Sequence, residues 1–394
     1  MPKALAPLYI LSGLFALLLN FSRLRAAETR QTFLAALLIG SVLFFSLSWL
    51  WTIAPYETLR LILPITGLFI LGLVIVILAL DLNESERRLV CRSIVIGSTI
   101  GFVILFVEIF WPLKITSFFF SIFKGIEYQI DYTYKNALRN GANISALLVI
   151  PAAAVLWRSG NRYFTLGLIL LALITLTNAK AGASLLALLV GLAAIAVTIV
   201  SGRYVRVLFS SLLVISALAL PVVVQTLPTA GEIEERYPNL PNSVYPRIFI
   251  WQSTARYISE NPFLGKGFNS SRSISKPGDR VEYFTKGVNP RGSIPIPLHP
   301  HSAILQIWLE LGVVGIGIFL ALLLTILKRI EQSISSLSMR AMAYGSFCSA
   351  FTIANVSYGI WQNWWISALW LTVAFTIIAT KDDPPLTGKH EPTP

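Results

Sequence analysis

The sequence predicts an all-α, polytopic integral membrane protein: a helical bundle of about eleven spans with one long external loop that contains short helices. Hydrophobic residues make up 55% of the 394 residues, charged residues make up only 13%, and the mean hydropathy is +0.71. A soluble domain of this size would hardly stay in solution with that composition. The apolar residues also form repeated runs of about 17–25, the length that crosses a hydrocarbon core roughly 30 Å thick. Composition and run length therefore indicate the same fold class.

Eleven apolar runs are the predicted spans, and ten or twelve spans also fit the pattern. They cover residues 4–21, 32–51, 60–80, 93–111, 141–157, 163–179, 182–200, 207–227, 302–327, 340–359 and 361–380. No small-residue cleavage motif follows the first run, so we expect an uncleaved span there and not a secretory signal. The chain then divides into N-terminal transmembrane helices at 1–227, a loop at 228–301, C-terminal transmembrane helices at 302–380 and a tail at 381–394.

Basic residues in the short loops predict the orientation. Under this span count one side of the membrane receives Arg23, Arg25, Arg30, Arg87, Arg88, Arg92, Arg158, Arg162, Arg203, Arg206, Lys328, Arg329, Arg340 and Lys381. The positive-inside rule makes that side cytoplasmic. Residues 112–140 and the long loop 228–300 then face outward, and external segments of this length usually carry binding or chemistry.

The long loop is rich in Pro, Gly, Asn and Ser, and its nine basic residues outnumber its six acidic ones. Within it, "YPRIFIWQSTARYISENPFLGKGF" predicts one helix, with Pro246 at the first helical position and the helix ending at Asn261 before Pro262. Helical spacing puts Arg247 and Trp251 on one face. We expect this helix to lie along the outer membrane–water boundary.

Two of the three histidines, His299 and His301, stand directly before the apolar run that starts at Ser302. If that run is one helix, His301 lies at its outward N-terminus. The partial positive charge of a helix start disfavours imidazolium, so a neutral His301 could accept a proton near pH 7. The simpler alternative is an interfacial histidine that caps the helix. His299, between two prolines, could serve only to shape the turn.

Several cations could meet an anion at the outward side. Arg247 falls in the first turn of its helix, where a cation opposes the helix dipole unless an anion is bound there. The alternative partner is a lipid headgroup or a loop acid. Lys180, in "TNAKAGASLLAL", is similar but could simply extend its ammonium group to the interface. Arg139 and Arg272 are weaker members of the same class. Glu310 lies at membrane depth and therefore needs a partner, for which Gln306, four residues earlier, is the candidate.

Other chemistries find little support in the sequence. Cys91 and Cys348 fall beside or inside separate apolar runs, which argues against a disulfide framework, and two cysteines with two clustered histidines make a zinc site improbable. No strand precedes the glycines of "NPFLGKGFN", so they do not form a nucleotide loop. We expect no cofactor, no metal and no nucleic-acid partner; membrane lipids are the expected surroundings.

The segment "YPRIFIWQSTARYISENPFLGKGFNSSRS", followed by "HPHSAILQIWLELGVVGI", resembles the signature of the O-antigen ligase family, whose relatives include O-antigen polymerases and protein O-oligosaccharyltransferases. The matching positions are Arg247, Trp251, Pro262, Gly265, Gly267, His301, Ser302, Glu310, Gly312 and Gly315. The segment "LRNGANISALLVIPAA" and the Lys180 segment resemble the family's upstream spans. Many relatives have an arginine near Lys180, and a lysine there gives up a bidentate contact.

The resemblance implies a glycosyltransferase in the bacterial inner membrane with a periplasmic active site. It would move O-antigen polysaccharide from undecaprenyl-diphosphate to the lipid A-core oligosaccharide. His301 would be the general base, and Arg247 and Lys180, with Arg139 and Arg272, would hold the diphosphate. A direct displacement would invert the anomeric carbon without a metal, because the cationic side chains would do the metal's work.

Three alternatives remain open at this point. A polymerase would use the same donor with a carrier-linked acceptor, and a protein O-oligosaccharyltransferase would use a protein. A lipid-linked glycan transporter is the third. A transporter should place ionisable residues near the bilayer midplane at broken helices, whereas the ionisable residues here cluster at the outer boundary, which favours an interfacial enzyme.

Overall fold

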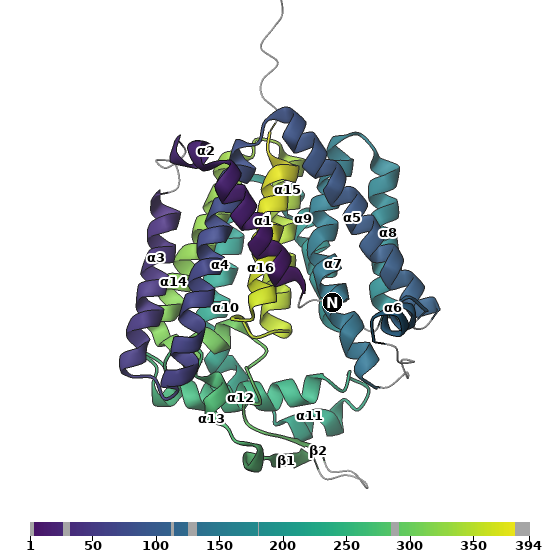
Figure 1. The fold of residues 1–394 in the computed structure, drawn as a ribbon. Coiled ribbons are helices and arrows are strands. Elements are labelled where there is room, and N and C mark those ends of the chain that lie inside the picture. The colour runs from purple at the N-terminus through teal and green to yellow at the C-terminus, as the bar shows by residue number, and fades with distance from the viewer. Residues whose placement is uncertain are drawn as a thin grey trace, which may run out of the picture.

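The computed structural model describes residues 4–26, 32–111, 114–124, 132–179, 181–284 and 291–382 as a bundle of long helices with a smaller layer across one end (Figure 1). The long helices are α1 (Leu5–Leu19), α3 (Thr32–Leu47), α4 (Pro55–Asp81), α5 (Glu84–Phe110), α7 (Tyr132–Arg158), α8 (Arg162–Asn178), α9 (Gly182–Ser201), α10 (Val205–Thr226), α14 (Ala303–Ser333), α15 (Leu337–Val356) and α16 (Asn363–Thr380). Shorter helices are α2 (Phe21–Ala26), α6 (Lys114–Lys124), α11 (Ala230–Arg236), α12 (Val244–Glu260) and α13 (Ser271–Ile274). Strands β1 (Val281–Phe284) and β2 (Arg291–Ser293) form an antiparallel hairpin.

Each of the eleven predicted spans corresponds to one long helix, and the predicted fold class, an all-α polytopic membrane bundle, is confirmed. Within the described residues, seven helical segments are long and apolar enough to cross a membrane: Phe33–Leu50, Pro55–Asp81, Glu84–Phe110, Leu138–Arg158, Gly182–Thr226, Ala303–Ser333 and Asn363–Thr380. The segment Gly182–Thr226 contains both α9 and α10. Two further apolar helices, Leu5–Leu19 and Arg162–Asn178, are shorter.

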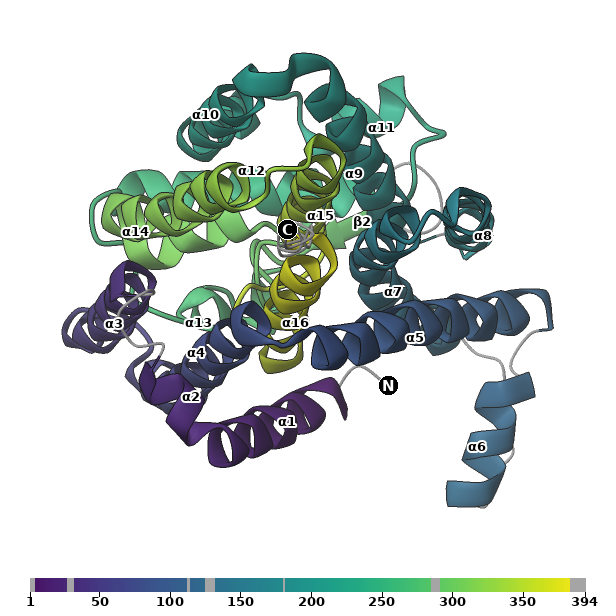
Figure 2. The same cartoon turned by 90° about the horizontal axis from the view of Figure 1, so that it is seen from above.

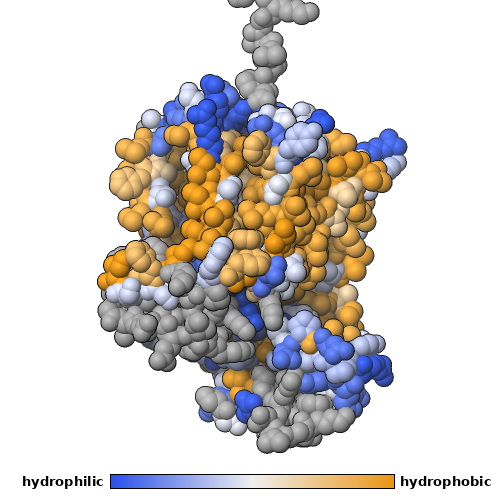
Figure 3. Space-filling view, turned by 90° about the vertical axis from the view of Figure 1, so that its right-hand side faces the viewer, coloured by the Kyte–Doolittle hydropathy of each residue, from blue (hydrophilic) through white to orange (hydrophobic). Residues whose placement is uncertain are grey.

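The two ends of the bundle carry different segments. The α4–α5, α7–α8, α9–α10 and α14–α15 connections meet at one end, which we call the basic end (Figure 1). Residues 228–284 and 291–302 cover the other end, which we call the histidine end. On the face that Figure 3 presents, a hydrophobic surface covers the helices between these two more hydrophilic ends. The described basic residues that the sequence assigned to one side of the membrane therefore do share one end of the molecule.

Small residues let the central helices pack closely. Figure 2 shows α15 and α16 in the middle of the bundle, with α1, α3, α8 and α10 toward its periphery. A Cβ atom on Gly191 of α9 would lie 3.0 Å from the carbonyl oxygen of Gly345 on α15, and one on Gly345 would lie 2.9 Å from that of Gly191. Such close backbone approach is how membrane helices gain van der Waals contact.

The structure corrects three local expectations. Helix α12 starts at Val244, two residues before Pro246. Proline is still tolerated there, because the amide groups of a first helical turn have no intrahelical partner to lose. Helix α7 starts at Tyr132, so Arg139 lies within this helix and not in a segment before it. Finally, α14 is not one uninterrupted helix, because Gly312 adopts φ 61° and ψ −159° within it.

Candidate active site

His301 lies immediately before α14, and a hydrogen bond determines which of its ring nitrogens carries the proton. Its Nδ1 is 2.6 Å from the carbonyl oxygen of Ser357, in the α15–α16 connection. A carbonyl oxygen can only accept, so Nδ1 donates and the neutral ring leaves Nε2 without a proton. Ser302, not His301, caps α14, with its side chain accepting from the amide of Leu305. The imidazole is therefore an oriented proton acceptor and not the helix cap.

His299 supports the strained backbone of His301. The φ of His301 is 57°, a left-handed conformation that is uncommon for residues with a side chain. The His301 amide donates to Nδ1 of His299 at 3.2 Å, and the two rings lie edge to face with their centroids 4.3 Å apart. A Cβ atom on Gly359 would come within 2.8 Å of Cγ of His299, so only glycine fits behind that ring. The predicted turn-shaping role of His299 agrees with these contacts.

Both histidines are neutral near pH 7. Burial, followed by the charges of His301 and Arg272, lowers the pKa of His299 to about 3. Burial also lowers the pKa of His301; the hydrogen bond to Ser357 opposes this, and the charge of Arg247 adds to it. The direction agrees with the expectation from the sequence. The cause differs from the expected one. Burial and the guanidinium of Arg247 lower the pKa of His301, whereas the sequence predicted that the partial positive charge of a helix N-terminus would lower it.

Helix α12 brings Arg247 and Trp251 to the histidines. The Trp251 indole donates to the carbonyl oxygen of Pro300 at 2.9 Å, which ties the helix to the residue before His301. Arg247 donates from Nη1 to the carbonyl of Ser243 at 2.9 Å, while its Nε is buried without a hydrogen-bond partner among the described residues. Burial first, and then the charge of Arg139, lowers the pKa of the Arg247 guanidinium. A partly buried cation that feels a second positive charge is a candidate for binding an anion.

The other predicted cations differ in how clearly they join this group. Arg139 of α7 is exposed, has further contacts, and acts electrostatically on Arg247. Arg272 of α13 is exposed and lowers the pKa of His299. Lys180 lies outside the described residues, although α9 begins two residues after it. Arg247 of α12 and Arg272 of α13 therefore act on the two imidazoles, and Arg139 of α7 acts on Arg247.

Glu310 is fully buried in α14 and holds the loop that leads to Arg272. Its carboxylate accepts from the amide of Asn269 at 2.6 Å, from Trp361 Nε1 at 2.7 Å and from Gln306 Nε2 at 2.9 Å. Ser271 also donates to it. The hydrogen bond with Gln306 that the sequence predicted is confirmed, and the other donors satisfy an acid that would be costly to bury alone.

The two glycine-containing motifs fit into one another. The amides of Lys266 and Gly267 donate to the carbonyls of Leu309 and Glu310, each at 2.8 Å, where α14 is broken. A Cβ atom on Gly265 would lie 2.4 Å from the carbonyl carbon of Glu310, and one on Gly312 would lie 2.2 Å from the carbonyl oxygen of Phe263. The glycines thus allow backbone to pass against backbone.

Comparisons with known proteins agree with this geometry. A family model described as O-antigen ligase matches residues 165–320. The chain is 30% identical over 368 residues to a Rickettsia felis protein named "Putative polysaccharide ligase", and the match covers 91% of this chain and 85% of that protein. A Rickettsia bellii protein of the same name is 28% identical over 379 residues, covering 93% of this chain and 86% of that protein.

The chain belongs to the O-antigen ligase family. The resemblance of the loop and glycine motifs is thereby confirmed. As a member of this family the protein is an enzyme of polysaccharide ligation. It joins a glycan from a lipid-linked donor to an acceptor. The matched range contains Arg247, Trp251, His301 and Glu310.

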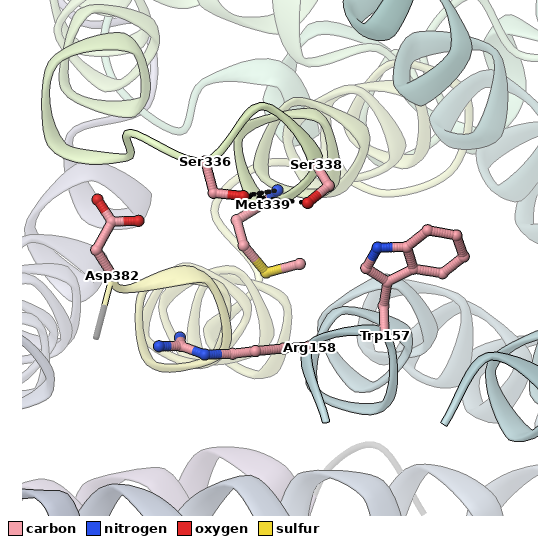
Figure 4. Close-up of a pocket in the computed structure, with 6 residues that line it drawn as sticks. All are labelled: Trp157, Arg158, Ser336, Ser338, Met339 and Asp382. Atoms are coloured by element: carbon pink, nitrogen blue, oxygen red, sulfur yellow. Dashed lines mark hydrogen bonds between the residues drawn. The ribbon is translucent and has the colours of Figure 1, made fainter. Parts of the chain in front are cut away.

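A cavity of about 290 Å³ lies at the basic end of this O-antigen ligase family protein, away from the histidines (Figure 4). It is lined by Trp157, Arg158, Ser336, Ser338, Met339 and Asp382. Arg158 and Arg139 are on the same helix, nineteen residues or roughly 28 Å apart. The Arg158 guanidinium extends toward the Asp382 side of the cavity (Figure 4). The cavity and the histidines are therefore separate places.

Sequence reasoning missed the α15–α16 connection of this family member. Ser357 and Gly359 contact the two imidazoles, yet neither residue type marks a site by itself. A usable signal was the polar, aromatic segment "NVSYGIWQNWW" between two apolar runs, because loops at the outward side tend to carry function.

Proposed function

We propose that this protein is an O-antigen ligase of the bacterial inner membrane. It transfers O-antigen polysaccharide from undecaprenyl-diphosphate to a sugar hydroxyl of the lipid A-core oligosaccharide, at an active site that faces the periplasm. One observation carries the proposal: His301 presents an unprotonated Nε2, fixed by the Ser357 carbonyl, within electrostatic reach of the partly buried cation Arg247. A proton acceptor beside positive charge suits the attack of an alcohol on a phosphate-activated sugar.

The reaction is a single displacement. The acceptor hydroxyl oxygen attacks the anomeric carbon of the donor sugar while its proton moves to Nε2 of His301. The bond between that carbon and the diphosphate oxygen breaks, and undecaprenyl-diphosphate leaves with the electron pair. Because the attack and the departure occur on opposite faces, the anomeric carbon is inverted. A positioned general base typically contributes about 10²–10⁴-fold to such a step.

The departing diphosphate carries the charge that the cations bind. Arg247 is the strongest candidate, because its Nε has no hydrogen-bond partner among the described residues and Arg139 raises the positive potential around it. Arg139 and Arg272 add to the same potential, and Lys180 is a further candidate. These side chains replace a metal ion in our proposal, so activity should survive excess EDTA. The basic end would face the cytoplasm, in accord with the positive-inside rule.

The alternative is an O-antigen polymerase, whose acceptor is a second lipid-linked repeat, or a protein O-oligosaccharyltransferase. The general base and the diphosphate site would serve all three, so the acceptor decides between them. The transporter alternative lacks support, because the cations we invoke belong to the histidine end and not to the middle of the bundle.

Acceptor preference is the direct test. The purified protein in lipid nanodiscs would be given a donor with a labelled glycan on undecaprenyl-diphosphate. The acceptor would be lipid A-core, a second lipid-linked repeat, a secreted protein, or none of these. We expect the label to be transferred to lipid A-core. One molecule of free undecaprenyl-diphosphate should be released for each labelled glycan transferred. Chain elongation without lipid A-core would instead identify a polymerase, and label on proteins an oligosaccharyltransferase.

A further inference from the structure

A chain of hydrogen bonds beneath His301 joins three elements that are far apart in the sequence. The hydroxyl of Tyr358 donates to Oδ1 of Asn140 on α7 at 2.6 Å and accepts from Nδ2 of Asn143 at 2.6 Å. Oδ1 of Asn143 in turn accepts from the hydroxyl of Ser184 on α9 at 2.7 Å. Asn143 and Ser184 are 3% and 0% exposed, so the network lies in the protein interior.

The network ends at the carbonyl that orients the imidazole. Tyr358 directly follows Ser357, whose carbonyl oxygen accepts the hydrogen bond from His301 Nδ1. Nδ2 of Asn143 also reaches the Ser357 hydroxyl at 3.4 Å. Ser357 is the C-cap residue that follows α15, and the carbonyls at the end of a helix have no intrahelical partner, so the next peptide decides where the Ser357 carbonyl points. Fixing Tyr358 therefore fixes the direction of the Ser357 carbonyl.

Packing leaves the tyrosine ring little freedom. Its centroid lies 4.6 Å from the ring of Trp364 and 5.3 Å from that of Trp365. Burial raises the pKa of Tyr358, so its hydroxyl keeps its proton and can donate to Asn140 across the physiological range. A buried polar network in which each group has its partner holds one geometry, because any other arrangement leaves a desolvated group unpaired.

We propose that Tyr358 and Asn143 are positioning residues for His301, which hold the Ser357 carbonyl so that the proton stays on Nδ1 and Nε2 faces the acceptor hydroxyl. The expected effect of Tyr358 on the reaction rate rests on the proposed general-base role of His301. Its effect on the imidazole itself stands independently of the reaction catalysed.

The first experiment observes the imidazole. Nitrogen NMR of protein labelled in its three histidines distinguishes Nδ1–H from Nε2–H forms, and the variants H299A and H390A identify the signals. We expect His301 to be in the Nδ1–H form in the wild type and in a mixture of forms in Tyr358→Phe, which loses one oxygen atom. Tyr344→Phe is the matched control, because it removes another buried tyrosine hydroxyl, bonded to Glu331 at 3.0 Å toward the basic end. An unaltered His301 signal in Tyr358→Phe would overturn the proposal.

The second experiment separates positioning from simple loss of folded protein. We expect kcat of Tyr358→Phe to fall about 10- to 100-fold, as for a small misplacement of a catalytic group, with the donor KM nearly unchanged. The acidic limb of the rate profile should also move to lower pH, because the Ser357 carbonyl raises the pKa of His301 and a looser bond does so less. Tyr344→Phe should leave both unchanged.

The other groups that act on His301 are left intact by this substitution. These are His299 beside it, Arg247 on α12 and, through Arg247, Arg139 on α7. If the maximal kcat of Tyr358→Phe falls but the acidic limb of its pH–rate profile stays at the wild-type pH, the role of Tyr358 is purely structural and the proposal is contradicted. If Tyr358→Phe fails to fold, Ser184→Ala is the second variant, because it removes a small hydroxyl group at the far end of the same network. An unaltered His301 signal in Ser184→Ala would then overturn the proposal. Normal NMR behaviour of the wild type without ligase activity would reject only the proposed function.

Discussion

The two ends of the bundle use their cations in opposite ways. At the basic end some of the described arginines meet carboxylates of another helix: Arg23 lies 3.0 Å from Glu86, and Arg340 lies 2.7 Å from Glu331. At the histidine end Arg247 meets a backbone carbonyl and the field of Arg139. The pair Lys266–Glu260, at 2.6 Å, also belongs to this end but joins the loop to the far end of α12.

Cations at the basic end therefore form ion pairs that connect helices, whereas Arg247 at the histidine end has no carboxylate partner among the described residues and can bind an anionic ligand. A neutralised arginine has little attraction left for a diphosphate, whereas a partly buried and unneutralised one repels protons and attracts anions. Burial is the main cause of the lowered pKa values of His299, His301 and Arg247, and neighbouring positive charge adds to it in each case. Substitutions at each end test this contrast between the two ends.

The largest effect is expected from His301→Ala. Removing the proton acceptor should lower kcat by about 10²–10⁴-fold, with the protein still inserted and folded. Polymer-capped lipopolysaccharide in a deletion strain and turnover in nanodiscs both measure this. His390→Ala, in the C-terminal tail, is the control histidine and should retain wild-type capping. Normal capping by the His301 variant would remove the general-base role.

Arg247→Ala should weaken donor use by about 10- to 100-fold, the value of a charged hydrogen bond lost from a buried site. Arg256→Ala is the matched control, because Arg256 is an exposed arginine on the same helix. The measurement is binding of the undecaprenyl-diphosphate donor, together with its KM. Equal affinities in the two variants would mean that Arg247 only anchors α12.

The rate should be constant around pH 7 and fall on acidification. Catalysis needs the unprotonated imidazole, and burial lowers the pKa of His301 below its usual value of 6.5. The base form therefore persists as the pH falls past 6.5, and below the lowered pKa the rate should drop about tenfold per pH unit. A limb at or above 6.5 in a pH series of kcat/KM would contradict the burial of this site.

Gly312→Ala should destabilise the fold by about 1–3 kcal/mol or more, because its backbone conformation is one that residues with side chains rarely adopt. The added methyl would also meet the Phe263 carbonyl at 2.2 Å. Thermal unfolding in detergent measures the effect. Gly317→Ala, in the same helix with no atom within 4 Å of the new methyl, is the control and should unfold no earlier than the wild type.

The smallest effect is expected from Arg23→Ala at the basic end. The Arg23–Glu86 pair, at 3.0 Å, is largely exposed, and exposed pairs contribute little because water and salt screen them. Turnover and melting temperature should match the wild type. A loss of donor binding here would show that the basic end also takes part in the reaction.

The sequence determined the class of this protein and most of its helices, because hydrophobic run length and composition are local properties. Helix α12 could be predicted nearly to its ends for the same reason, from a proline, a run of helix-compatible residues and Asn261. The motif residues Arg247, His301 and Glu310 could be selected by type and spacing, and family resemblance gave them provisional roles.

Only the tertiary structure decided how those residues meet. The hydrogen bond from His301 to the Ser357 carbonyl joins residues 56 positions apart, and the one from Trp251 to Pro300 joins residues 49 apart. Both acceptors are backbone carbonyls, which every residue carries and no sequence pattern marks. The break in α14 is of the same kind, since Gly312 takes its conformation from a loop packed against it. Backbone partners across long separations are a property of the packed chain, and there the sequence alone could not decide.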